Sequence, residues 1–497
     1  MHMSKTLHAK IPDEVSHVTE TLTKGGFEAY LIGGCTRDLI LGRKPKDWDV
    51  TTNATPEEIV KLFPKTFYEN NYGTVGVVNE GTTDETLKIV EVTPYRLETG
   101  YSDKRRPDSV TWSKNLEDDL KRRDFTINAI ALRVVAKNQE EVIDVYSGIE
   151  DLNRKIIKTV GKPEERFSED ALRMLRAIRL HAELGFAIEK ETADAIAANA
   201  HLLQHIAKER IRDEFSRILL SDNPMEALVV AHKLGVLRFI AQEITKAVGV
   251  EQNQAHSYDV FEHLLRSLQH AADKKWPLDI RLAALFHDIS KPETRRWAED
   301  KKEWTFYGHD VVGARVTKKI LENLRYSKEI IAKVTIMVRW HMFFTDTEQI
   351  TLSAVRRMVV NVGKENIWDL MNLRICDRVG TGRPKENPYR LRKYKSMIEE
   401  ALRDPISVGM LKIDGNELIS EVKLTPGPKI GQILHALLED VLEDPTKNTK
   451  EYLQKRAVEL ALLPEKELKA LGEKGKETKE AKDEAELGEI RKKHGVK

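Results

Sequence analysis

Two aspartates separated by one residue form a pair that could hold a metal ion. On an extended strand, residues i and i+2 point to the same face, so Asp47 and Asp49 would project together while Trp48 faces the core. Adjacent carboxylates repel each other unless a cation lies between them, and such hard oxygen ligands favour Mg²⁺ bound together with phosphates. The pair predicts two-metal phosphoryl transfer with a leaving pyrophosphate. The alternative is an exposed aspartate pair at a strand end.

A glycine turn lies upstream of the aspartates, between a predicted strand and a predicted helix. Gly33 and Gly34 let backbone amides approach a phosphate, and Arg37 adds a guanidinium for a bidentate grip. A Gly-Gly turn alone is more often only a turn. Close to a carboxylate pair, it indicates a phosphate site.

Charged residues recur every three positions in a helical segment that begins at Ser168. They are Asp170, Arg173, Arg176 and Arg179. This spacing winds around a helix and interleaves the arginines with leucines, which predicts partly buried cations that need a partner such as a nucleotide. A carboxylate that accepts from the exocyclic amino group and a guanidinium that donates to the ring nitrogen would admit cytosine and adenine but reject uracil and guanine. Internal salt bridges from Glu169 and Asp170 are the alternative.

Histidines and aspartates form an ordered series in the middle of the chain. The series is His263, His287, Asp288, His309, His341 and Asp377. Imidazoles and carboxylates bind divalent metals, and an adjacent His-Asp pair can hold an ion whose shell more distant residues complete. A single histidine is more often a structural residue. Only the ordered set predicts a metal site.

Strand and helix signals alternate in the N-terminal part, which must position the aspartates and the glycine turn. The expected strands are 27–32, 48–52, 74–78 and 87–92. A helix is expected over 37–41, and Thr55, Pro56 and Glu58 predict a helix start with a capping box. After Asp151, helical periods dominate and strand signals nearly vanish. Glu91, on a neighbouring strand, is a candidate for a further carboxylate near the metals.

The charge balance leaves nucleic acid open as a partner. The chain has 81 Lys and Arg against 80 Asp and Glu, a net charge of +1, which excludes only a uniformly basic surface. No run approaches the ~20 apolar residues of a membrane span, and the N-terminus does not resemble a secretory signal. Cys35 and Cys376 cannot form a disulfide framework and suit a reducing compartment. We therefore expect a cytoplasmic protein with no membrane partner.

Four segments carry a family resemblance. LIGGCTRDLILGRKPKDWDVTT at 31–52 resembles the signature of class II nucleotidyltransferases of the polymerase-beta superfamily, which contains the tRNA CCA-adding enzymes and bacterial poly(A) polymerases. In the family's order follow YSDKRRPDSV at 101–110, similar to its flexible loop, KRRDFTINAIAL at 121–132, similar to its ribose-reading motif, and SEDALRMLRAIRL at 168–180, similar to its base-reading helix.

The resemblance implies roles for individual residues of the N-terminal half of the chain. Asp47 and Asp49 would be catalytic and would bind Mg²⁺. The implied nucleotide-binding residues are Gly33, Gly34, Arg37, Arg123, Asp124, Asn128, Asp170, Arg173, Arg176 and Arg179. Among these, Asp170 and Arg173, with Glu169, match the family's amino-acid template for CTP and ATP. The complete loop 101–107 is what the family needs to switch from C to A addition.

The histidine series resembles the metal site of HD-domain phosphohydrolases. This resemblance implies His263, His287, Asp288 and Asp377 as ligands of a divalent metal, with His309 and His341 as candidate ligands of a second one. In one branch of the family HD domains accompany the head, and phosphatase or 2',3'-cyclic phosphodiesterase activity is implied there.

We therefore expect an α+β protein with a small mixed-sheet, palm-like nucleotidyltransferase head followed by all-α regions. The expected parts are the head (1–150), a helical neck and body with the base-reading helix (151–245), an HD domain (246–385), a helical tRNA-binding tail (386–462) and a charged C-terminal segment (463–497). The basic connector at 381–396 suits RNA backbone contact or a solvated linker equally.

The expected activity is template-independent addition of CCA to the 3' end of tRNA from CTP and ATP, with Mg²⁺ as cofactor and an HD phosphohydrolase as a side activity. One alternative within the class is A-only or poly(A) addition to RNA. Alternatives of other classes are an HD phosphohydrolase as the main activity and a non-catalytic RNA chaperone.

Overall fold

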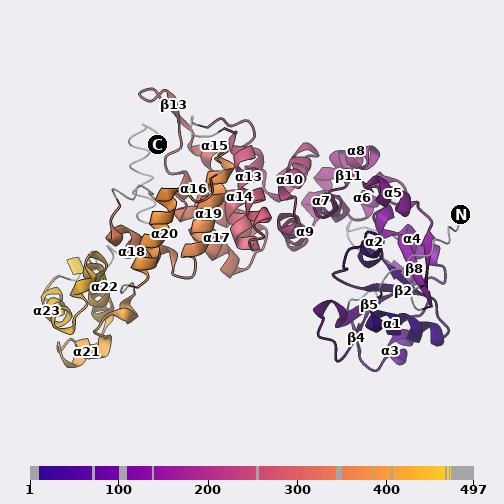
Figure 1. The fold of residues 1–497 in the computed structure, drawn as a ribbon, viewed down its shortest axis with the longest axis horizontal. Helices are drawn as coiled ribbons and strands as arrows, with labels where there is room; N and C mark the ends of the chain where they lie inside the picture. Colours follow the sequence, from indigo (N-terminus) through magenta and orange to yellow (C-terminus); the bar gives the residue numbers. More distant parts are fainter. Residues whose placement is uncertain are drawn as a thin grey trace. The chain divides into compact units, whose positions relative to one another are not determined.

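The computed structural model describes residues 11–69, 73–99, 109–136, 139–252, 257–342, 350–383, 385–403, 407–464, 467–468 and 471. The chain forms two compact units that divide after Ile240 (Figure 1). The N-terminal unit combines a mixed sheet with helices, and the described part of the C-terminal unit is helical apart from one small hairpin. The expected α+β class is confirmed. The finer division into five parts remains a prediction.

A seven-stranded mixed sheet lies at the centre of the N-terminal unit. Its order is β3-β4-β5-β2-β1-β8-β9, and of these neighbours only β2 and β5 run parallel. Its strands are β1 (Ala29–Ile32), β2 (Asp49–Thr52), β3 (Thr66–Tyr68), β4 (Val75–Val78), β5 (Ile89–Pro94), β8 (Ile130–Ala136) and β9 (Gln139–Asp144). The four expected strands are present, and β2 and β1 stand in the middle of the sheet.

Buried side chains of the central strands build the core. β1 is buried along its whole length, whereas β5 is buried at alternate positions. Along β5, Val90, Val92 and Pro94 are buried while the residues between them are not, which is the two-residue period of a half-covered strand. One part of the core joins Tyr30, Ile32, Tyr95, Leu120 and Ala131. This core fixes the central strands, and with them the residues at their ends.

Helices and short elements complete this unit. The helices of this unit are α1 (Asp13–Lys24), α2 (Gly34–Ile40), α3 (Pro56–Leu62), α4 (Leu116–Lys121), α5 (Gly148–Arg154), α6 (Pro163–Glu169), α7 (Leu172–Leu184), α8 (Lys190–Asn199), α9 (Lys208–Leu220), α10 (Pro224–Lys233) and α11 (Leu237–Ile240). Two further small sheets pair β6 (Arg96–Thr99) with β7 (Ser109–Trp112) and β10 (Ile156–Ile157) with β11 (Ala187–Ile188). Short 3-10 turns are η1 (Glu85–Leu87), η2 (Thr126–Asn128) and η3 (Ala200–His205). Some of these elements pack on the sheet, and α9, α10 and α11 pack on other helices and on a 3-10 turn. The predicted flexible loop 101–107 lies outside the described residues.

Local sequence signals set several helix ends. The capping box at α3 is present as predicted, with the Thr55 hydroxyl accepting from the Glu58 amide and the Glu58 carboxylate accepting from the Thr55 amide. The helix expected over 37–41 begins earlier, at Gly34, because Gly33 takes a left-handed φ of 79° and turns the chain directly into α2.

The prediction of one continuous helix from Ser168 is wrong, because the helix is interrupted at Asp170. The chain leaves the helix at Asp170, which is extended (φ −139°, ψ 104°), and α7 begins afresh at Leu172. The Asp170 carboxylate accepts a hydrogen bond from the Leu172 amide at 3.0 Å. A short acidic side chain that bonds the nearby backbone competes with a continuous helix. Asp170 therefore stands at a helix junction rather than on the helix that carries Arg173.

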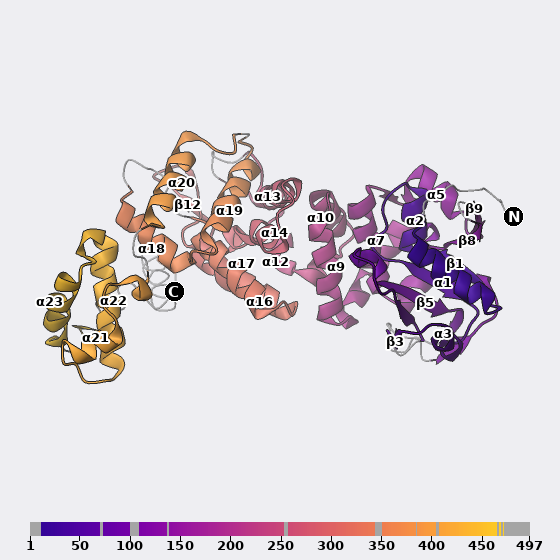
Figure 2. The same ribbon diagram turned by 60° about the horizontal axis from the view of Figure 1, so that its bottom comes forward.

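The C-terminal unit is a set of packed helices (Figure 2). Its helices are α12 (Gln242–Thr245), α13 (Val260–Asp273), α14 (Leu278–Phe286), α15 (Lys291–Thr294), α16 (His309–Asn323), α17 (Lys328–Trp340), α18 (Leu352–Val362), α19 (Ile367–Gly380), α20 (Tyr389–Ala401), α21 (Gly415–Ser420), α22 (Pro428–Glu443) and α23 (Lys450–Ala461), with the 3-10 turns η4 (Val408–Met410) and η5 (Pro445–Lys447). Helix α13 packs on α14 and α19, and α17 packs on α14 and α16. A hairpin that the sequence did not indicate joins β12 (Arg296–Ala298) to β13 (Glu303–Thr305).

Among the helices that the structure describes, none has both the length and the apolar character needed to span a membrane.

Candidate functional site

Three carboxylates meet at the start of β2. Asp49 is the first residue of this strand and Asp47 precedes it, while Trp48 between them is only 3% exposed, as the alternation predicts. The parallel register of β2 and β5 pairs Asp49 with Glu91. The sequence placed Glu91 on a neighbouring strand, and the structure brings it beside the aspartates.

The environment of Asp49 favours the binding of a cation. Burial, together with the nearby negative charges of Asp47 and Glu91, raises the pKa of Asp49 to about 7, although Arg123 and Arg176 oppose the shift. A carboxylate that resists ionisation because other carboxylates surround it gains most from a bound cation. This donor set of carboxylate oxygens fits Mg²⁺.

Binding of Mg²⁺ to the cluster of Asp47, Asp49 and Glu91 is expected to become tighter as the pH rises. Below pH 7 the Asp49 carboxyl is protonated and cannot serve as a ligand, whereas above pH 7 it is ionised, so affinity should rise about tenfold between pH 6 and pH 8. Calorimetric titration of Mg²⁺ into the full chain at both pH values would measure this change. Asp49→Asn should remove the pH-dependent component, and an affinity that is constant with pH in the wild type would contradict the assignment.

The glycine turn approaches the carboxylates closely. A Cβ atom at Gly33 would lie 3.3 Å from an Asp49 carboxylate oxygen and 3.3 Å from an Arg123 guanidinium nitrogen, and the left-handed backbone there also favours glycine. At Gly34 a Cβ atom would lie 3.8 Å from the Asp47 carboxylate. The turn therefore keeps the space beside both aspartates open for a ligand.

A chain of polar contacts runs from α2 to α7 past this turn. Arg37 donates to the Asn128 side-chain oxygen at 2.9 Å, Asn128 donates to Asp124 at 3.3 Å, and Arg176 pairs with Asp124 at 2.8 Å. Arg179 pairs with Glu214 at 2.9 Å. Burial raises the pKa of Asp124, but Arg176 and Arg173 outweigh it and hold that pKa below its usual value. Asp124 and Arg176 are therefore both charged, and these contacts hold Arg37, Asn128 and Arg176 in place.

A cleft of about 590 Å³ opens beside these residues. Among the predicted site residues, Gly34, Arg37, Asp47, Asp49, Asn128, Arg176 and Arg179 line it. Basic residues that were not predicted also line it, namely Arg43, Lys44, Lys46 and Arg217. The volume lies within the range of ligand pockets, and the combination of carboxylates with several cations suits a metal-bound triphosphate.

Asp170 and Arg173, the predicted base-reading pair, both have protein partners. Arg173 donates to the Glu169 carboxylate at 2.5 Å and to the backbone oxygens of Arg166 and Arg122 at 3.1 and 3.0 Å. Asp170 accepts two hydrogen bonds from Arg210. Neither Asp170 nor Arg173 lines the cleft. Internal salt bridges, the alternative to a nucleotide partner, are therefore present, and Arg210 is a residue that sequence reasoning missed.

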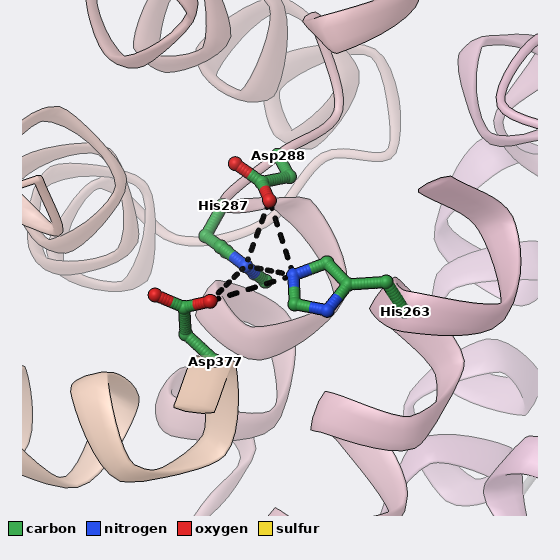
Figure 3. Close-up of side chains that lie close together, drawn as sticks. All are labelled: His263, His287, Asp288 and Asp377. Carbon is green, nitrogen blue, oxygen red and sulfur yellow. Dashed lines mark hydrogen bonds and ion pairs between the residues drawn. The ribbon is translucent and has the colours of Figure 1, made fainter. Parts of the chain in front are cut away.

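Four predicted ligands converge in the C-terminal unit, each from a different position in the helical bundle. His263 lies on α13, His287 and Asp288 follow α14, and Asp377 lies on α19 (Figure 3). The His263 Nε2 atom is 2.9 Å from the His287 Nε2 atom and 3.1 Å from the Asp288 carboxylate, and the His287 Nε2 atom is 3.7 Å from the Asp377 carboxylate. Together they form a buried group that could hold one metal ion.

Asp288 also belongs to a second group. Its Oδ2 atom faces His263 and His287, and its Oδ1 atom lies 3.1 Å from the His309 Nε2 atom and 3.4 Å from the His341 Nε2 atom. The three residues Asp288, His309 and His341 form a second group with the spacing of metal ligands. The Asp288 carboxylate thus belongs to both groups of candidate metal ligands.

Backbone contacts aim the imidazoles. The Nδ1 atoms of His287, His309 and His341 lie 2.9, 2.6 and 2.7 Å from the carbonyl oxygens of Ala284, Phe306 and Val338. A carbonyl can only accept, so each Nδ1 carries the proton and each Nε2 keeps a lone pair for a metal. This arrangement of donors fits a divalent metal at both groups.

The electrostatics agree with a cation site. Burial would lower the pKa of His287, but Asp288 and Asp377 raise it to about 10. Burial would raise the pKa of Asp288, yet Lys291, 2.6 Å away, and His287 hold it well below its usual range. The carboxylates of Asp288 and Asp377 are therefore ionised, and their negative charge favours either a proton on the His287 Nε2 atom or a metal ion in its place.

A cavity of about 970 Å³ opens onto Asp288, His309 and Asp377. Its basic lining residues are Lys291, Lys301, Arg374, Arg378, Arg383 and Arg390, and its aromatic ones are Trp304, Phe306, Tyr307 and Tyr389. Part of this lining comes from the basic connector at 381–396, to which the sequence assigned RNA contact or a linker role. The structure places that connector beside the metal ligands.

Family models match three parts of the chain. The model of the poly A polymerase head domain matches residues 29–158, that of a probable RNA and SrmB-binding site of polymerase A matches residues 185–248, and that of the HD domain matches residues 260–371. The first match contains Asp47, Asp49 and Glu91. The third contains five of the six candidate metal ligands of the C-terminal unit, and the sixth, Asp377, lies just beyond it.

Known proteins resemble the chain over most of its length. The CCA-adding enzyme of Lactiplantibacillus plantarum is 33% identical over 88% of this chain and 93% of its own length, and that of Geobacillus thermodenitrificans is 31% identical over 90% and 97%. Among solved structures, the Bacillus stearothermophilus CCA-adding enzyme in complex with CTP matches with a TM-score of 0.65 and 28% identity, covering 90% of this chain and 98% of that one. By fold and by sequence, this chain belongs to the family of CCA-adding enzymes.

Proposed function

We propose that this chain adds CMP, CMP and AMP in that order to the 3' end of tRNA, using CTP and ATP and releasing pyrophosphate at each step. The observation that carries the proposal is the carboxylate group of Asp47, Asp49 and Glu91 beside a cleft lined by cations, in a chain of the CCA-adding family. A solved relative, the Thermotoga maritima CCA-adding enzyme, is described in complex with tRNA, and another in complex with CTP.

Residues of the head and of α7 have separate roles in the reaction. Asp47 and Asp49 would hold Mg²⁺, which supplies charge stabilisation for the phosphoryl oxygens and lowers the pKa of an attacking hydroxyl. Arg37, Asn128 and Arg176 would bind the triphosphate and ribose. The RNA 3'-oxygen then bonds to the α-phosphorus as the bond to the bridging oxygen of pyrophosphate breaks, and the hydroxyl proton leaves to solvent.

Base selection would rest on two side chains. The Asp170 carboxylate would accept a hydrogen bond from the exocyclic amino group of cytosine or adenine, and the Arg173 guanidinium would donate to the ring nitrogen. Uracil and guanine present the opposite pattern and would leave both groups unpaired, which in other polar sites discriminates by about 10⁴-fold or more. The complete loop 101–107 in the sequence supports addition of the terminal A as well as the two Cs, over CC-only addition.

The test is extension of three tRNA transcripts that end before CCA, after C and after CC. With purified full chain, Mg²⁺, CTP and ATP, sequencing of the products should give CCA, CA and A additions respectively. Extension of only the last transcript would instead support A-only addition, a run of adenylates would support poly(A) addition, and no extension of any transcript would overturn the proposal.

A second candidate function belongs to the two groups of candidate metal ligands that share Asp288, which we call the HD centre. The observation that favours it is the Asp288 carboxylate shared by two groups of metal ligands at the edge of a large cavity lined by cations and aromatic residues. Two metals that share a carboxylate suit hydrolysis of a phosphate ester, and cations around them suit its charge. We propose a metal-dependent phosphohydrolase activity at this centre.

We also propose that the protein works in the cytoplasm. Both cysteines are free and buried, which agrees with a reducing compartment.

A further inference from the structure

We propose that Arg210 positions the Asp170 carboxylate for base selection and thereby sets the preference of the head for cytosine and adenine. This inference rests on the proposed function, because it concerns how the same nucleotide site chooses its substrate. Arg210 lies on α9, forty residues after Asp170, and no spacing motif in the sequence connects the two residues.

Arg210 and Asp170 form a bidentate salt bridge. Arg210 Nη1 donates to Asp170 Oδ1 at 3.3 Å, and Arg210 Nη2 donates to Asp170 Oδ2 at 2.9 Å. A guanidinium that meets both oxygens of a carboxylate fixes the plane of that carboxylate as well as its position. Both side chains are largely shielded, with 26% of the Arg210 side chain and 14% of the Asp170 side chain exposed.

The salt bridge with Arg210 leaves few hydrogen-bond acceptor positions of the Asp170 carboxylate for a base. A carboxylate offers about four lone-pair positions. Within the described residues, Arg210 occupies two of those of Asp170 and the Leu172 amide occupies a third, on Oδ1. One acceptor position remains, on Oδ2, with its direction fixed. A single position of this kind suits a single amino-group donor.

Hydrogen bonds to the protein also fix the position of the Arg173 side chain. Its contacts to Glu169, Arg166 and Arg122 use three of its five N–H groups, so two remain, on Nε and Nη2. Both members of the pair thus present a residual, directed hydrogen-bonding capacity: an acceptor on Asp170 and a donor on Arg173. That is the pattern complementary to the pairing edge of cytosine and adenine.

Removal of Arg210 would free the Asp170 carboxylate to rotate. A rotated carboxylate can accept from the ring N–H of uracil or guanine, so the site would lose selectivity while the metal-binding aspartates stay intact. A merely structural Arg210 would lower the rates with CTP and UTP alike. The ratio between them therefore separates the two roles.

The experiment measures kcat/KM for addition of one nucleotide to tRNA lacking CCA, with CTP and with UTP. Arg210→Ala should lower the CTP to UTP ratio by about 10- to 100-fold, the value of a charge-assisted hydrogen-bond pair. Arg210→Lys keeps the charge but not the bidentate salt bridge and should give an intermediate ratio. It also provides the test if the alanine variant does not fold. Arg212→Ala is the matched control, because Arg212 lies on the same helix and pairs with its neighbour Asp213.

The double variant Asp170→Ala with Arg210→Ala provides a second readout. If Arg210 acts through Asp170, the double variant should be no less selective than Asp170→Ala alone. An unchanged CTP to UTP ratio in folded Arg210→Ala, or additive losses in the double variant, would overturn the inference. Failure of the wild type to add CMP would instead overturn the proposed function beneath it.

Discussion

Asp49→Asn is expected to reduce CMP and AMP addition by about 10³-fold or more, because the carboxylate group loses the charge that would hold Mg²⁺. A metal ion that stabilises the phosphoryl charge contributes several kcal/mol, and each 1.36 kcal/mol corresponds to a tenfold change in rate. Asn keeps the shape of Asp49, so the packing around β2 should be retained. Single-turnover incorporation of labelled CMP into tRNA lacking CCA measures the effect.

Two controls separate this loss from general damage. Asp194→Asn removes an exposed carboxylate of the same unit, one that pairs with Lys190 on α8, and should leave the rate within about twofold. Phosphoester hydrolysis at the HD centre should be unchanged in Asp49→Asn. Nucleotide addition that persists in this variant, at a rate close to wild type, would show that the carboxylate group of the head does not catalyse the reaction.

Asp288→Asn is expected to remove both metals of the HD centre and its hydrolytic activity together. Each oxygen of this carboxylate faces a different group of imidazoles, so one substitution takes a ligand from both groups. The loss of hydrolysis should be about 10³-fold, on the same scale as above. Metal content by mass spectrometry, after loading with Mn²⁺ and desalting, and hydrolysis of 2',3'-cyclic AMP and p-nitrophenyl phosphate measure the two effects.

The comparison variant for this centre is Asp273→Asn. Asp273 is exposed at the end of α13 and accepts a hydrogen bond from Gln269, outside both metal groups. It should keep the metal content and the hydrolysis of the wild type, and both variants should keep CCA addition. If Asp288→Asn lost CCA addition and kept hydrolysis, the assignment of the two activities to separate centres would be wrong.

Local sequence patterns were sufficient for features that depend on neighbours in the chain. The alternation around Trp48 predicted that Trp48 faces the core, and the structure confirms this: Trp48 is buried, while Asp47 is exposed and Asp49 is half-buried. The capping box at Thr55 and Glu58 is likewise present. Such features depend on strand pleating and on hydrogen bonds across three residues, which a short sequence window contains.

Short-range reasoning also failed at one informative place. The regular spacing after Ser168 predicted one helix, but the Asp170 side chain bonds the Leu172 amide and is gripped by Arg210, so the helix breaks there. A distant arginine contributes to this outcome, and no periodicity of the local segment contains it. The tertiary contact overrides the helical pattern, as contacts of a side chain with distant residues often do.

The sequence by itself determined which functional groups the protein contains and their order along the chain: the carboxylates of Asp47 and Asp49 and the glycine turn in the head, and the histidine series in the middle. Only the tertiary structure decided which of them meet. The pairing of Asp49 with Glu91 depends on the register between β2 and β5, and the sharing of Asp288 by two metal groups depends on how α13, α14, α16, α17 and α19 pack. Contacts between distant residues form only where packing repays the entropy of closing the intervening chain, and no local pattern records that balance.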